Sequence, residues 1–433
     1  MEITYTKEIP VRYTTDVLVA GGGPSGVAAA VLCARVQKDW GDRVLLLEQS
    51  GTFGGSSTLA GVPELMNFDD GKNFLAKGFG EEIYTSLYGD CPLDRSWPTV
   101  QPARLKVLYD RLMEESGAAF HFYSRIVDVV MADGRITHVI VSAPEGLYAI
   151  QTKVVIDCTG SGAVCVLAGC DYAYGDENGS TMSATLCSTW GGVDFSRKNN
   201  DGAYIPRALQ DGVLTQYDLL LPGIKPTFPA VGVGGGNVGH CFGVRDIDTE
   251  SITAAMVEGR RRLEEYQVYY NRYVPGCEHA VLLDSAPYLG IRESRRICCV
   301  ETLSESDFYD QSVKPNEIGR YSYPIDIHPV TADATGMQGF SKHVSCRHDV
   351  GESYSIPYGC LVPKDARNLL VAGRCMGTDQ AMQASIRVIP GCYITGQAAG
   401  VAAALSVHTQ VDPVAVDVGT LRALLADYCS MRV

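Results

Sequence analysis

Short apolar runs and one helical repeat open the chain. Residues 17–20 are apolar throughout and run into glycine, as the strands of a buried parallel sheet do. Apolar residues recur at helical spacing from Pro24 to about Lys38, and residues 43–48 ("RVLLLE") form a second apolar run. This order of strand, glycine turn, helix and strand predicts one βαβ unit of a parallel sheet.

Further elements follow in the same half of the chain. Residues 102–117 show an amphipathic helical pattern that ends at a glycine, which predicts a helix. Residues 119–150 alternate between apolar and polar positions around an Asp133-Gly134 turn, which predicts a β-hairpin or meander. Residues 153–160 ("KVVIDCTG") predict another buried strand.

The middle of the chain has a different composition and hydrophobic pattern, which indicates an inserted domain. From about residue 165 to residue 354 it is rich in Gly, Tyr, Pro and charge, with one clear helix near residues 253–269. The earlier pattern then returns as a strand at residues 368–373 and a small-residue helix at residues 395–407. We therefore expect a nucleotide-binding domain made of residues 12–165 and 355–433, with a substrate domain, residues 166–354, inserted between them.

A glycine motif joins the first strand to the first helix. Gly21, Gly23 and Gly26 fit the pattern G-x-G-x-x-G, and Glu48 ends the second strand 22 residues after Gly26. The first glycine allows a tight turn, the second lets a pyrophosphate approach the backbone, and the third brings the helix close to the sheet. Free N–H groups at the helix N-terminus suit phosphate, and the carboxylate suits ribose, so the unit predicts a bound dinucleotide.

A second stretch, "GGGNVG" at residues 234–239, fits the same glycine pattern. The segment before it is not a convincing strand, no amphipathic helix follows, and no acid closes a second strand. We interpret this stretch as a flexible loop, with a second nucleotide site as the alternative.

Composition restricts the classes of partner. The net charge is −14 and the chain has no long Lys/Arg run, so we expect no nucleic-acid binding. Apolar runs are broken well short of about 20 residues, and the N-terminus has no signal-peptide pattern, so we expect no membrane span and a cytoplasmic location. The 15 cysteines include no C-x-x-C spacing and are expected to be reduced, mostly buried thiols.

The continuation after the second strand distinguishes FAD from NAD. NAD-binding domains run on into further βα units, whereas here a glycine-rich loop follows, "SGTFGGSSTLAGV". Such a loop suits a long ligand that extends past the first motif. The later strand end, "DCTGSG" at residues 157–162, adds more glycine beside the same ligand.

Six segments resemble the FAD-dependent oxidoreductase family of the glutathione-reductase-like, two-dinucleotide-fold superfamily, whose relatives include the fumarate reductase and succinate dehydrogenase flavoproteins. In order, they are "DVLVAGGGPSGVAAA", "GTFGGSSTLAGV", "VVIDCTGSG", "LGIRESRRI", "YPIDIH" and "IPYGCLVPKDARNLLVAGRCMGTDQAMQASIRVIPGCYITGQAAGVAAA". The resemblance implies FAD as cofactor and an α/β fold. It implies a Rossmann-like FAD-binding domain, a parallel sheet plus a β-meander, that carries an inserted α+β substrate domain.

The resemblance also implies which residues contact FAD. The first turn would hold the pyrophosphate through Gly21, Gly23, Pro24, Ser25 and Gly26, and Glu48 would bind the adenosine ribose. The other expected contacts are Gly54, Gly55 and Ser56 along the ribityl and isoalloxazine end, Val127 at adenine, Gly160 near the phosphates, Gly373 and Arg374 closing the site, and Thr395, Gly396 and Gln397 at the start of the final helix. That helix would direct its N-terminus at the flavin.

The candidates for catalysis are two arginines and two histidines. Arg292 lies in "GIRESRRI", where a helix would place it on one face with Arg295 and Arg296, and Arg387 lies in "SIRVIP". Arginine binds carboxylates bidentately, so both favour an anionic substrate, although Arg292 could instead belong to an ion-pair network. His328 in "PIDIHP" and His240 are the candidates for proton transfer, and each could equally be a structural histidine.

Other polar residues are weaker candidates. Tyr323 and Tyr358 could contribute hydroxyl groups, and "HVSCRH" (His343, Cys346 and His348) could suggest a metal. Three possible ligands without a second cluster make a poor zinc site, so we expect no metal and interpret this stretch as an exposed loop.

We expect an FAD-dependent oxidoreductase, a dehydrogenase or reductase that acts on a small organic substrate by hydride transfer at flavin N5. The alternatives are a flavin-binding protein without turnover and an NAD(P)H-linked flavin reductase. The absence of C-x-x-C near the first helix argues against a disulfide reductase. The electron donor or acceptor and the oligomeric state stay open.

Overall fold

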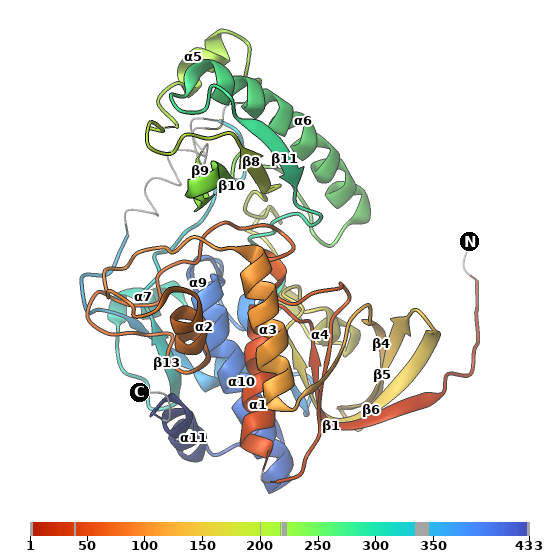
Figure 1. Cartoon of the computed structure of the whole chain (residues 1–433). Coiled ribbons are helices and arrows are strands. Elements are labelled where there is room, and N and C mark those ends of the chain that lie inside the picture. The colour runs from red at the N-terminus through yellow and green to blue at the C-terminus, as the bar shows by residue number, and fades with distance from the viewer. Residues whose placement is uncertain are drawn as a thin grey trace.

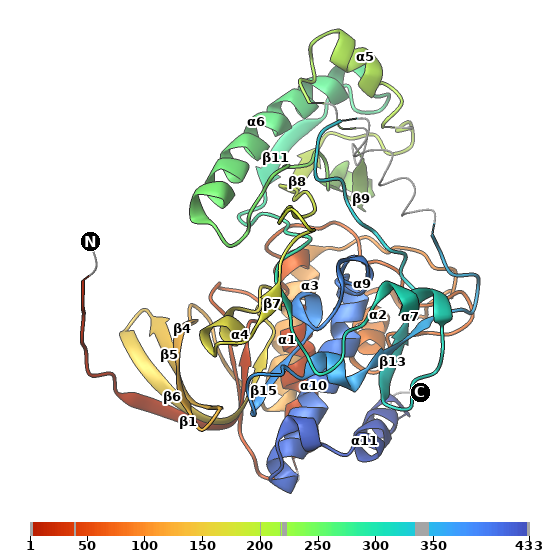
Figure 2. The same ribbon diagram turned by 180° about the vertical axis from the view of Figure 1, so that it is seen from behind.

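Two lobes make up the molecule, and Figures 1 and 2 show the smaller one standing above the larger one. The computed structural model describes residues 3–430 except residues 39, 200, 217, 219–222 and 334–345, and it leaves the side chains of residues 428–430 undescribed. Within these residues, the larger lobe contains segments from both halves of the chain, whereas the smaller lobe comes from the middle.

A seven-stranded sheet is the framework of the larger lobe, in the order β3-β2-β1-β6-β5-β4 with β15 also paired to β6. The strands are β1 (Val11–Ala20), β2 (Val44–Leu47), β3 (Ala119–His121), β4 (Arg125–Ala132), β5 (Arg135–Ala143), β6 (Gly146–Asp157) and β15 (Leu369–Val371). β1, β2, β3, β6 and β15 are parallel, whereas β4 and β5 form an antiparallel meander with β6. This confirms the predicted α/β fold of parallel sheet plus meander.

The longest strand, β6, has two different neighbours on one edge. The meander strand β5 pairs with its first half, and β15, from the C-terminal part of the chain, pairs with its last three residues. The predicted turn of the meander is present, with Asp133 at φ 51° and Gly134 at φ 72°. The carboxyl ends of β1, β6 and β15 therefore lie together at one edge of the sheet, where loops that bind ligands occur in open α/β sheets.

Small residues allow two helices from opposite ends of the chain to pack closely beside this sheet. α1 (Pro24–Gln37) lies against α10 (Ile389–Thr409). A Cβ atom on Gly396 would lie 2.2 Å from the Ser25 carbonyl oxygen, and one on Gly400 would lie 2.2 Å from the Ala29 carbonyl oxygen. Glycine at both positions is therefore a condition of this contact.

Further elements complete the larger lobe. They are α2 (Phe79–Tyr88), α3 (Pro102–Ser116), α4 (Ala163–Leu167), β7 (Tyr172–Ala173), β12 (Arg296–Ile297), α7 (Glu305–Asp310), β13 (Glu317–Tyr321), β14 (Tyr354–Pro357), α9 (Gln380–Ile386) and α11 (Val418–Ser430), with 3-10 turns η1 (Gly55–Ser57), η3 (Tyr358–Leu361), η4 (Gly373–Cys375) and η5 (Pro413–Ala415). The helix predicted at residues 102–117 is α3, and Gly117 ends it in the left-handed conformation at φ 81°.

The prediction that the final helix starts at Thr395 is wrong. α10 begins six residues earlier, at Ile389, and α9 meets it at 95° across Arg387 and Val388. Pro390 at the second helical position lacks an N–H, which suits the first turn of a new helix rather than the interior of a long one.

The smaller lobe is an antiparallel sheet with one long helix beside it. Its strands are β8 (Ser188–Gly191), β9 (Ile224–Phe228), β10 (Val233–Gly236) and β11 (Val281–Ser285), in the order β11-β8-β10-β9. The helices are α5 (Ile205–Gln210) and α6 (Thr249–Tyr273), and η2 (Pro229–Val231) joins two strands. Trp190, Tyr269 and Tyr270 are fully buried in its core.

The interpretation of "GGGNVG" as a flexible loop is wrong. Three of its glycines belong to β10, an inner strand of the smaller sheet. A Cβ atom at Gly235 would lie 2.5 Å from Pro63, and one at Gly236 would lie 2.7 Å from the indole nitrogen of Trp190. The glycines therefore serve close packing within the sheet and against the larger lobe.

The two hydrophobic cores divide the chain at different places from the expected domains. Buried core residues of the smaller lobe run from Ala184 to Leu289, whereas Ile297 and Ile325 pack in the core of the larger lobe. The expected division at 165/166 and 354/355 stays a prediction.

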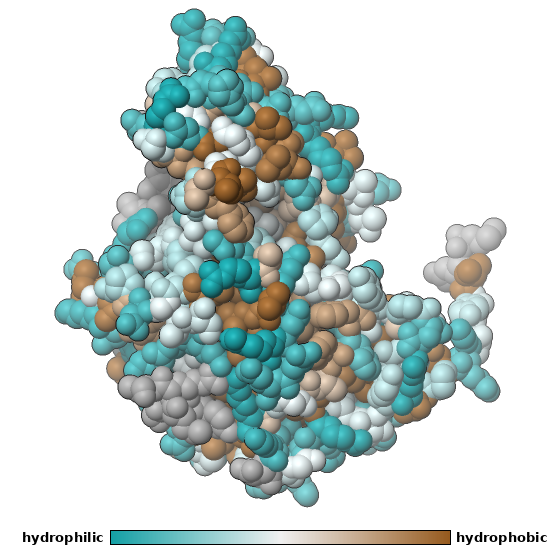
Figure 3. Space-filling model, viewed as in Figure 1, coloured by the Kyte–Doolittle hydropathy of each residue, from teal (hydrophilic) through white to brown (hydrophobic). Residues whose placement is uncertain are grey.

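Some apolar side chains of the smaller lobe are exposed. Figure 3 shows them gathered over its sheet, where Phe228, Val231, Val281 and Leu283 are solvent-exposed. The edge strands β9 and β11 thus leave apolar surface in contact with solvent.

Two further expectations concern whole classes of residue. Every cysteine whose side chain is described is a free thiol, and most are buried. Among the described residues no single helix is long and apolar enough to cross a membrane, and the bent pair α9 and α10 meets that length-and-composition test only when the two are joined.

Candidate active site

The first glycine turn brings three glycines into three different surroundings. Gly21 has φ 94°, and a Cβ there would lie 2.8 Å from the Cys158 carbonyl oxygen; a Cβ on Gly26 would lie 1.8 Å from the Gly21 carbonyl oxygen. A Cβ on Gly23, by contrast, would meet no described atom within 4 Å. Two glycines are thus required by the fold itself, whereas Gly23 faces open space.

The helix that starts at this turn has no side-chain cap. Gly23 is its N-cap, Pro24 is its first residue, and no acidic side chain lies in the first turn. The first backbone N–H groups and the positive end of the helix dipole are therefore free for an anionic ligand. This fits the pyrophosphate of a dinucleotide.

Glu48 is fixed by backbone N–H groups. Its Oε2 accepts a hydrogen bond from Gly22 and its Oε1 accepts one from Ser50, both at 2.7 Å. These bonds hold the carboxylate at the end of β2 beside the glycine turn. Each oxygen keeps a second lone pair for a ribose hydroxyl.

A second glycine loop lies directly against the first. Gly54 donates a backbone hydrogen bond to the Gly22 carbonyl oxygen at 2.8 Å, and a Cβ on Gly55 would lie 3.3 Å from the Cα of Gly23. Gly54 and Gly55 have φ values of 104° and 47°, and Ser56 continues the 3-10 turn η1. Two stretches of bare backbone therefore form one continuous cradle.

The C-terminal segment closes this cradle. Arg374 donates from Nε to the Gly160 carbonyl oxygen at 2.8 Å and from Nη1 to the Ile291 carbonyl oxygen. Gly373 has φ 76°, and a Cβ there would lie 2.6 Å from the hydroxyl of Ser25. The predicted contacts Gly160, Gly373 and Arg374 thus lie together at the first turn of α1.

Thr395, Gly396 and Gln397 lie two turns inside α10 and make contacts within the protein. The Thr395 hydroxyl accepts a hydrogen bond from the Gly373 N–H at 3.2 Å, and Gln397 Oε1 accepts one from the Phe79 N–H at 3.1 Å. The helix end that could direct its dipole at a ligand is Val388–Ile389 instead. Val127 lies on β4 at an irregularity of the register with β5, and its predicted contact with adenine stays a prediction.

Four distant segments meet in a buried acid/base cluster. His240 Nδ1 lies 3.0 Å from both oxygens of Asp218, and His240 Nε2 lies 2.8 Å from His328 Nδ1. His328 Nε2 lies 3.2 Å from Asp326 Oδ2, which also accepts a hydrogen bond from Arg387 Nη2 at 3.1 Å. We call these five side chains the histidine chain. Three of the four predicted catalytic residues are members of it.

Burial and charge set the protonation of the histidine chain. Burial, and next the charge of Arg292, lower the pKa of His328 to about 3, and burial also lowers the pKa of His240. Burial alone would raise the pKa of Asp326, but His328, Arg387 and Arg292 together bring it below its ordinary value. At neutral pH both imidazoles are therefore neutral and Asp326 is ionised.

Arg292, the fourth predicted catalytic residue, lies beside the histidine chain. Its Nη1 donates to the Ser183 carbonyl oxygen and to Thr185 Oγ1 at 2.8 Å, and its Nη2 donates to Asn237 Oδ1 at 3.2 Å. Burial, and then the charge of Arg387, lower the pKa of Arg292 to about 10. The guanidinium groups of Arg292 and Arg387 thus repel each other, which a bound anion would relieve.

The segment around Arg292 has no regular secondary structure, so the helix considered for it is wrong. Arg296 instead forms a buried ion pair with Glu293 at 2.7 Å, and Arg295 donates to the Ser161 carbonyl oxygen. The partners of Arg292, Arg295 and Arg296 are therefore different, and the three guanidinium groups do not share one helical face. The ion-pair network considered for this segment is real, but it belongs to Glu293 and Arg296.

The two carboxylates of the cluster were missed. Asp326 stands two residues before His328 in the quoted "YPIDIH", a signal that the sequence offers. Asp218 has no such signal, since it lies 22 residues before His240 and outside any motif. Of the weaker candidates, Tyr323 donates to Asp326 Oδ2 at 3.1 Å, whereas Tyr358 donates to the Pro413 carbonyl oxygen.

The metal site considered for "HVSCRH" falls partly outside the described residues. His343 lies outside the described residues, which contain no group of three or more His, Cys, Asp or Glu that could hold a metal ion. The interpretation as an exposed loop is wrong for His348, which is buried and stacked on Phe308 at 3.9 Å between ring centroids.

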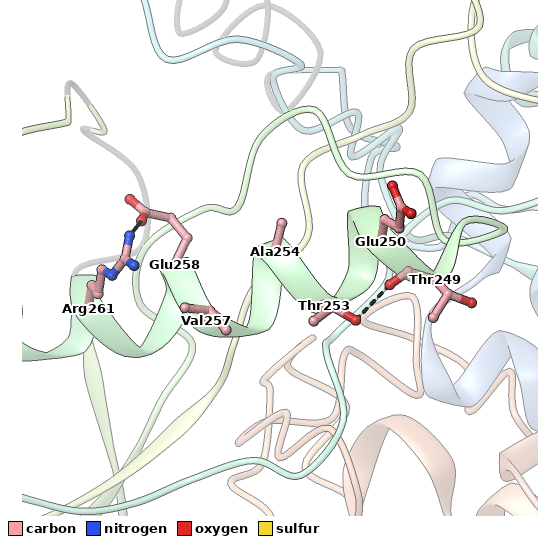
Figure 4. Close-up of a pocket in the computed structure, with 7 residues that line it drawn as sticks. All are labelled: Thr249, Glu250, Thr253, Ala254, Val257, Glu258 and Arg261. Atoms are coloured by element: carbon pink, nitrogen blue, oxygen red, sulfur yellow. Dashed lines mark hydrogen bonds and ion pairs between the residues drawn. The ribbon is translucent and has the colours of Figure 1, made fainter.

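A surface cavity lies away from this cluster. It has a volume of about 560 Å³ and lies along one exposed face of α6 (Figure 4). Its lining residues are Thr249, Glu250, Thr253, Ala254, Val257, Glu258 and Arg261. All seven come from α6, so the lining supplies no opposite wall that could enclose a substrate.

The chain belongs to the FAD-dependent oxidoreductase family, whose family model matches residues 16–425. It is therefore an oxidoreductase with FAD as cofactor, and the cradle of Gly21–Gly26, Glu48, Gly54, Gly55, Gly160 and Gly373 fits that group. The described residues supply uncapped N–H groups, open space at Gly23 and a fixed carboxylate, as a dinucleotide requires.

The chain is also similar to solved structures, among them the following three. A geranylgeranyl bacteriochlorophyll reductase-like protein from Thermoplasma acidophilum is 13% identical, with 97% of this chain and 83% of that chain covered and a TM-score of 0.45. The p-nitrophenol 4-monooxygenase PnpA from Pseudomonas putida DLL-E4 is 12% identical (97% and 86%, TM-score 0.44), and the anhydrotetracycline hydroxylase OxyS from Streptomyces rimosus is 15% identical (97% and 66%, TM-score 0.40). A search of curated proteins gave no match.

Proposed function

We propose that this enzyme oxidises or reduces a small organic anion, which is bound by Arg387 of the histidine chain and by the neighbouring Arg292. The observation that carries the proposal is the meeting of Arg292, Arg387, His240 and His328 in one buried cluster, although they are spread over about 150 residues of sequence. Perturbed pKa values in a cluster of this kind are typical of functional sites.

The cluster adjoins the FAD cradle through two links. Arg374 binds both Gly160 of the cradle and the carbonyl group of Ile291, which precedes Arg292. Cys392 donates to the Arg387 carbonyl oxygen at 3.2 Å, and its sulfur would lie 3.6 Å from a Cβ on Gly373. A substrate held at the two arginines would therefore lie next to the cofactor.

Bound FAD supplies hydride transfer at N5. The protein's own contribution is to bind the anion through guanidinium groups and to move a proton at His328. The finer kinship, with glutathione-reductase-like and fumarate reductase or succinate dehydrogenase flavoproteins, and the sixteen assigned FAD contacts remain part of this proposal.

The test is a substrate screen of the FAD-loaded enzyme under anaerobic conditions. Small carboxylates are compared with their neutral amides, first as donors that bleach the oxidised flavin and then as acceptors that restore the colour of the reduced flavin. We expect a carboxylate to act and its amide to fail. Arg292→Lys and Arg387→Lys should lose most of this activity while they retain FAD, because lysine cannot reproduce bidentate binding.

Two results would contradict the proposal. Equal activity of the neutral amides would remove the role of the arginines. Bleaching by NAD(P)H alone, with no organic substrate turned over, would identify an NAD(P)H-linked flavin reductase instead.

A further inference from the structure

The histidine chain is one proton short of a complete set of hydrogen bonds. Besides the hydrogen bond from Arg387 to Asp326, three contacts join Asp218 to His240, His240 to His328, and His328 to Asp326. Each contact needs one proton, and two neutral imidazoles provide only two. When both imidazoles are neutral, one of these three contacts is therefore between two hydrogen-bond acceptors. A single added proton would turn this contact into a hydrogen bond.

The geometry locates the missing proton at His328 Nε2. Asp218 accepts hydrogen bonds from both the backbone N–H and the ring of His240, which fixes the proton of that ring on Nδ1. His240 Nε2 is then an acceptor, so His328 donates from Nδ1 and keeps a lone pair on Nε2. This lone pair faces the Asp326 carboxylate at 3.2 Å, the longest of the three contacts.

The Asp326 end of the histidine chain is also the end that is more accessible to solvent. The side chain of His240 is fully buried and that of Asp218 is 2% exposed, whereas Asp326 and Arg387 are 13% and 12% exposed. A proton or a small ligand would therefore reach His328 from the side of Asp326 and Arg387.

Local charge keeps this position unprotonated. Among the described side chains of the cluster, the carboxylates of Asp218 and Asp326 face the guanidinium groups of Arg292 and Arg387, and the charges of these four groups cancel when both carboxylates are ionised. An added proton would leave one buried positive charge, and an added anion one negative charge. Together they would restore neutrality, so each should favour the binding of the other.

Within the part of the chain that the structure describes, several other titratable groups lie near the cluster. They are Tyr323 on Asp326, Tyr266 near Asp218, Cys187 and Cys241 near Arg292, Cys392 near Arg387, and Arg347 near Tyr323. Burial raises the pKa of each of these tyrosines and of the three cysteines, so they are neutral at pH 7. Arg347 adds one more positive charge, in the same sense as Arg292.

We propose that His328 takes up one proton when an anion binds at Arg292 and Arg387, and that Asp326 and the Asp218–His240 pair are positioning residues that hold this proton. That the ligand is an organic anion rests on the proposed function. The coupling between a negative charge near Arg292 and the protonation of His328 does not. The anion-bound site would thus carry a proton donor only while the substrate is in place.

The first test places a negative charge in the site without any ligand. Asn237 Oδ1 accepts from Arg292, so Asn237→Asp puts a carboxylate of nearly the same shape beside that guanidinium. In the FAD-loaded protein, nitrogen NMR of the histidine rings should show the pKa of His328 raised by about one unit or more. An unchanged pKa would overturn the coupling.

A second pair of variants tests the same coupling through Arg292 itself. Arg292→Met removes the charge and should raise the pKa of His328, whereas Arg292→Lys keeps the charge and should leave it low. In Asp218→Asn, the proton of His240 should leave Nδ1, with a visible change of tautomer. Loss of FAD would identify a variant that fails to fold. In that case the Asn237→Asp result alone decides whether the coupling exists.

The third measurement separates this inference from the proposed function. Acetate and malonate are titrated into the wild-type protein, and the protons taken up are counted by calorimetry in buffers of different ionisation enthalpy. We expect proton uptake on binding that rises towards one proton per bound anion as the pH is lowered from neutral towards the pKa of His328 in the anion-bound protein. Binding without uptake would overturn the inference, whereas no binding of any carboxylate, with Asn237→Asp still active on His328, would contradict only the anionic substrate.

Discussion

Gly23 and Gly26 lie three residues apart in one turn, yet a side chain would meet opposite surroundings at the two positions. Gly23 has an ordinary φ of −67° and open space around it, whereas Gly26 touches the Gly21 carbonyl group. We expect Gly23→Val to abolish FAD retention while the FAD-free protein unfolds within about 0.5 kcal/mol of wild type. Gly26→Val should destabilise the fold by about 3 kcal/mol or more.

The measurement is FAD content after gel filtration, together with urea unfolding of the FAD-free proteins. Normal FAD content in a folded Gly23→Val protein would show that the pyrophosphate does not lie at this turn.

The buried histidines also make a prediction about pH. Because the pKa values of His240 and His328 are lowered in the folded state, the unfolded chain binds more protons below about pH 6.5. Stability should therefore fall with decreasing pH from 6.5 towards the folded pKa values, by about 1.4 kcal/mol per pH unit for each histidine.

His121 and His348 have lowered pKa values as well, so the comparison needs a control. His328→Gln, which keeps hydrogen-bonding groups but does not titrate, should show a slope smaller by about one proton in unfolding free energies measured between pH 5 and pH 7. An identical slope would mean that His328 is already protonated in the folded state.

How far the sequence could predict individual residues depends on the range of their contacts. Gly21, Gly23, Gly26 and Glu48 belong to one βαβ unit, so a local motif was sufficient to place them together. Asp218 contacts His240 and, through it, His328, which requires both lobes to be folded and docked. No spacing along the chain records such a contact, and it was missed.

At the level of elements, the contact between α1 and α10 favours glycine for close packing, whereas helix propensity favours alanine. Gly400→Ala would improve the intrinsic helix propensity by about 1 kcal/mol. Its Cβ, however, would lie 2.2 Å from the Ala29 carbonyl oxygen, and forcing the two helices apart costs about 1–3 kcal/mol or more. We therefore expect a net loss of stability, measured as a lower midpoint of urea unfolding.

Gly23→Ala is the matched control, because its Cβ meets no atom and its φ suits alanine. An unfolding midpoint of Gly400→Ala equal to or above that of wild type would show that the helices can separate freely.

Elements were predicted well where one hydrophobic period persisted along the segment. They were predicted poorly where tertiary contacts determined the secondary structure. The periodic segments of α1, α3 and the meander were recovered with their turns. The start of α10 was missed because Ile389–Ile394 is apolar on all sides, so it shows no helical period. The glycines of β10 were read as a loop because their strand is stabilised by neighbours such as Trp190 and Pro63 rather than by propensity.

For the whole molecule, the crossing between the two lobes is held by a buried ion pair. Glu293 accepts from Arg296, from Gln380 and from the Met182 N–H, and its side chain is fully buried. Glu293→Ala would leave the Arg296 charge unpaired, so we expect a loss of about 3–5 kcal/mol in unfolding free energy.

The exposed pair Arg197–Glu278 on the smaller lobe is the control, since its side chains are 60% and 42% exposed. Glu278→Ala should change stability by less than about 1 kcal/mol. Similar effects of the two substitutions would show that the Glu293–Arg296 ion pair is exposed to solvent.

The contact between α1 and α10 also has a consequence for synthesis on the ribosome. About 350 residues separate the two helices, and translation at about 5–20 residues per second leaves α1 waiting for tens of seconds before its partner emerges. The smaller lobe, whose core comes from one continuous stretch, can fold during that interval, whereas the coenzyme cradle matures last. Newly made chains should therefore depend on chaperones that shield the alanine-rich surface of α1 until translation is almost finished.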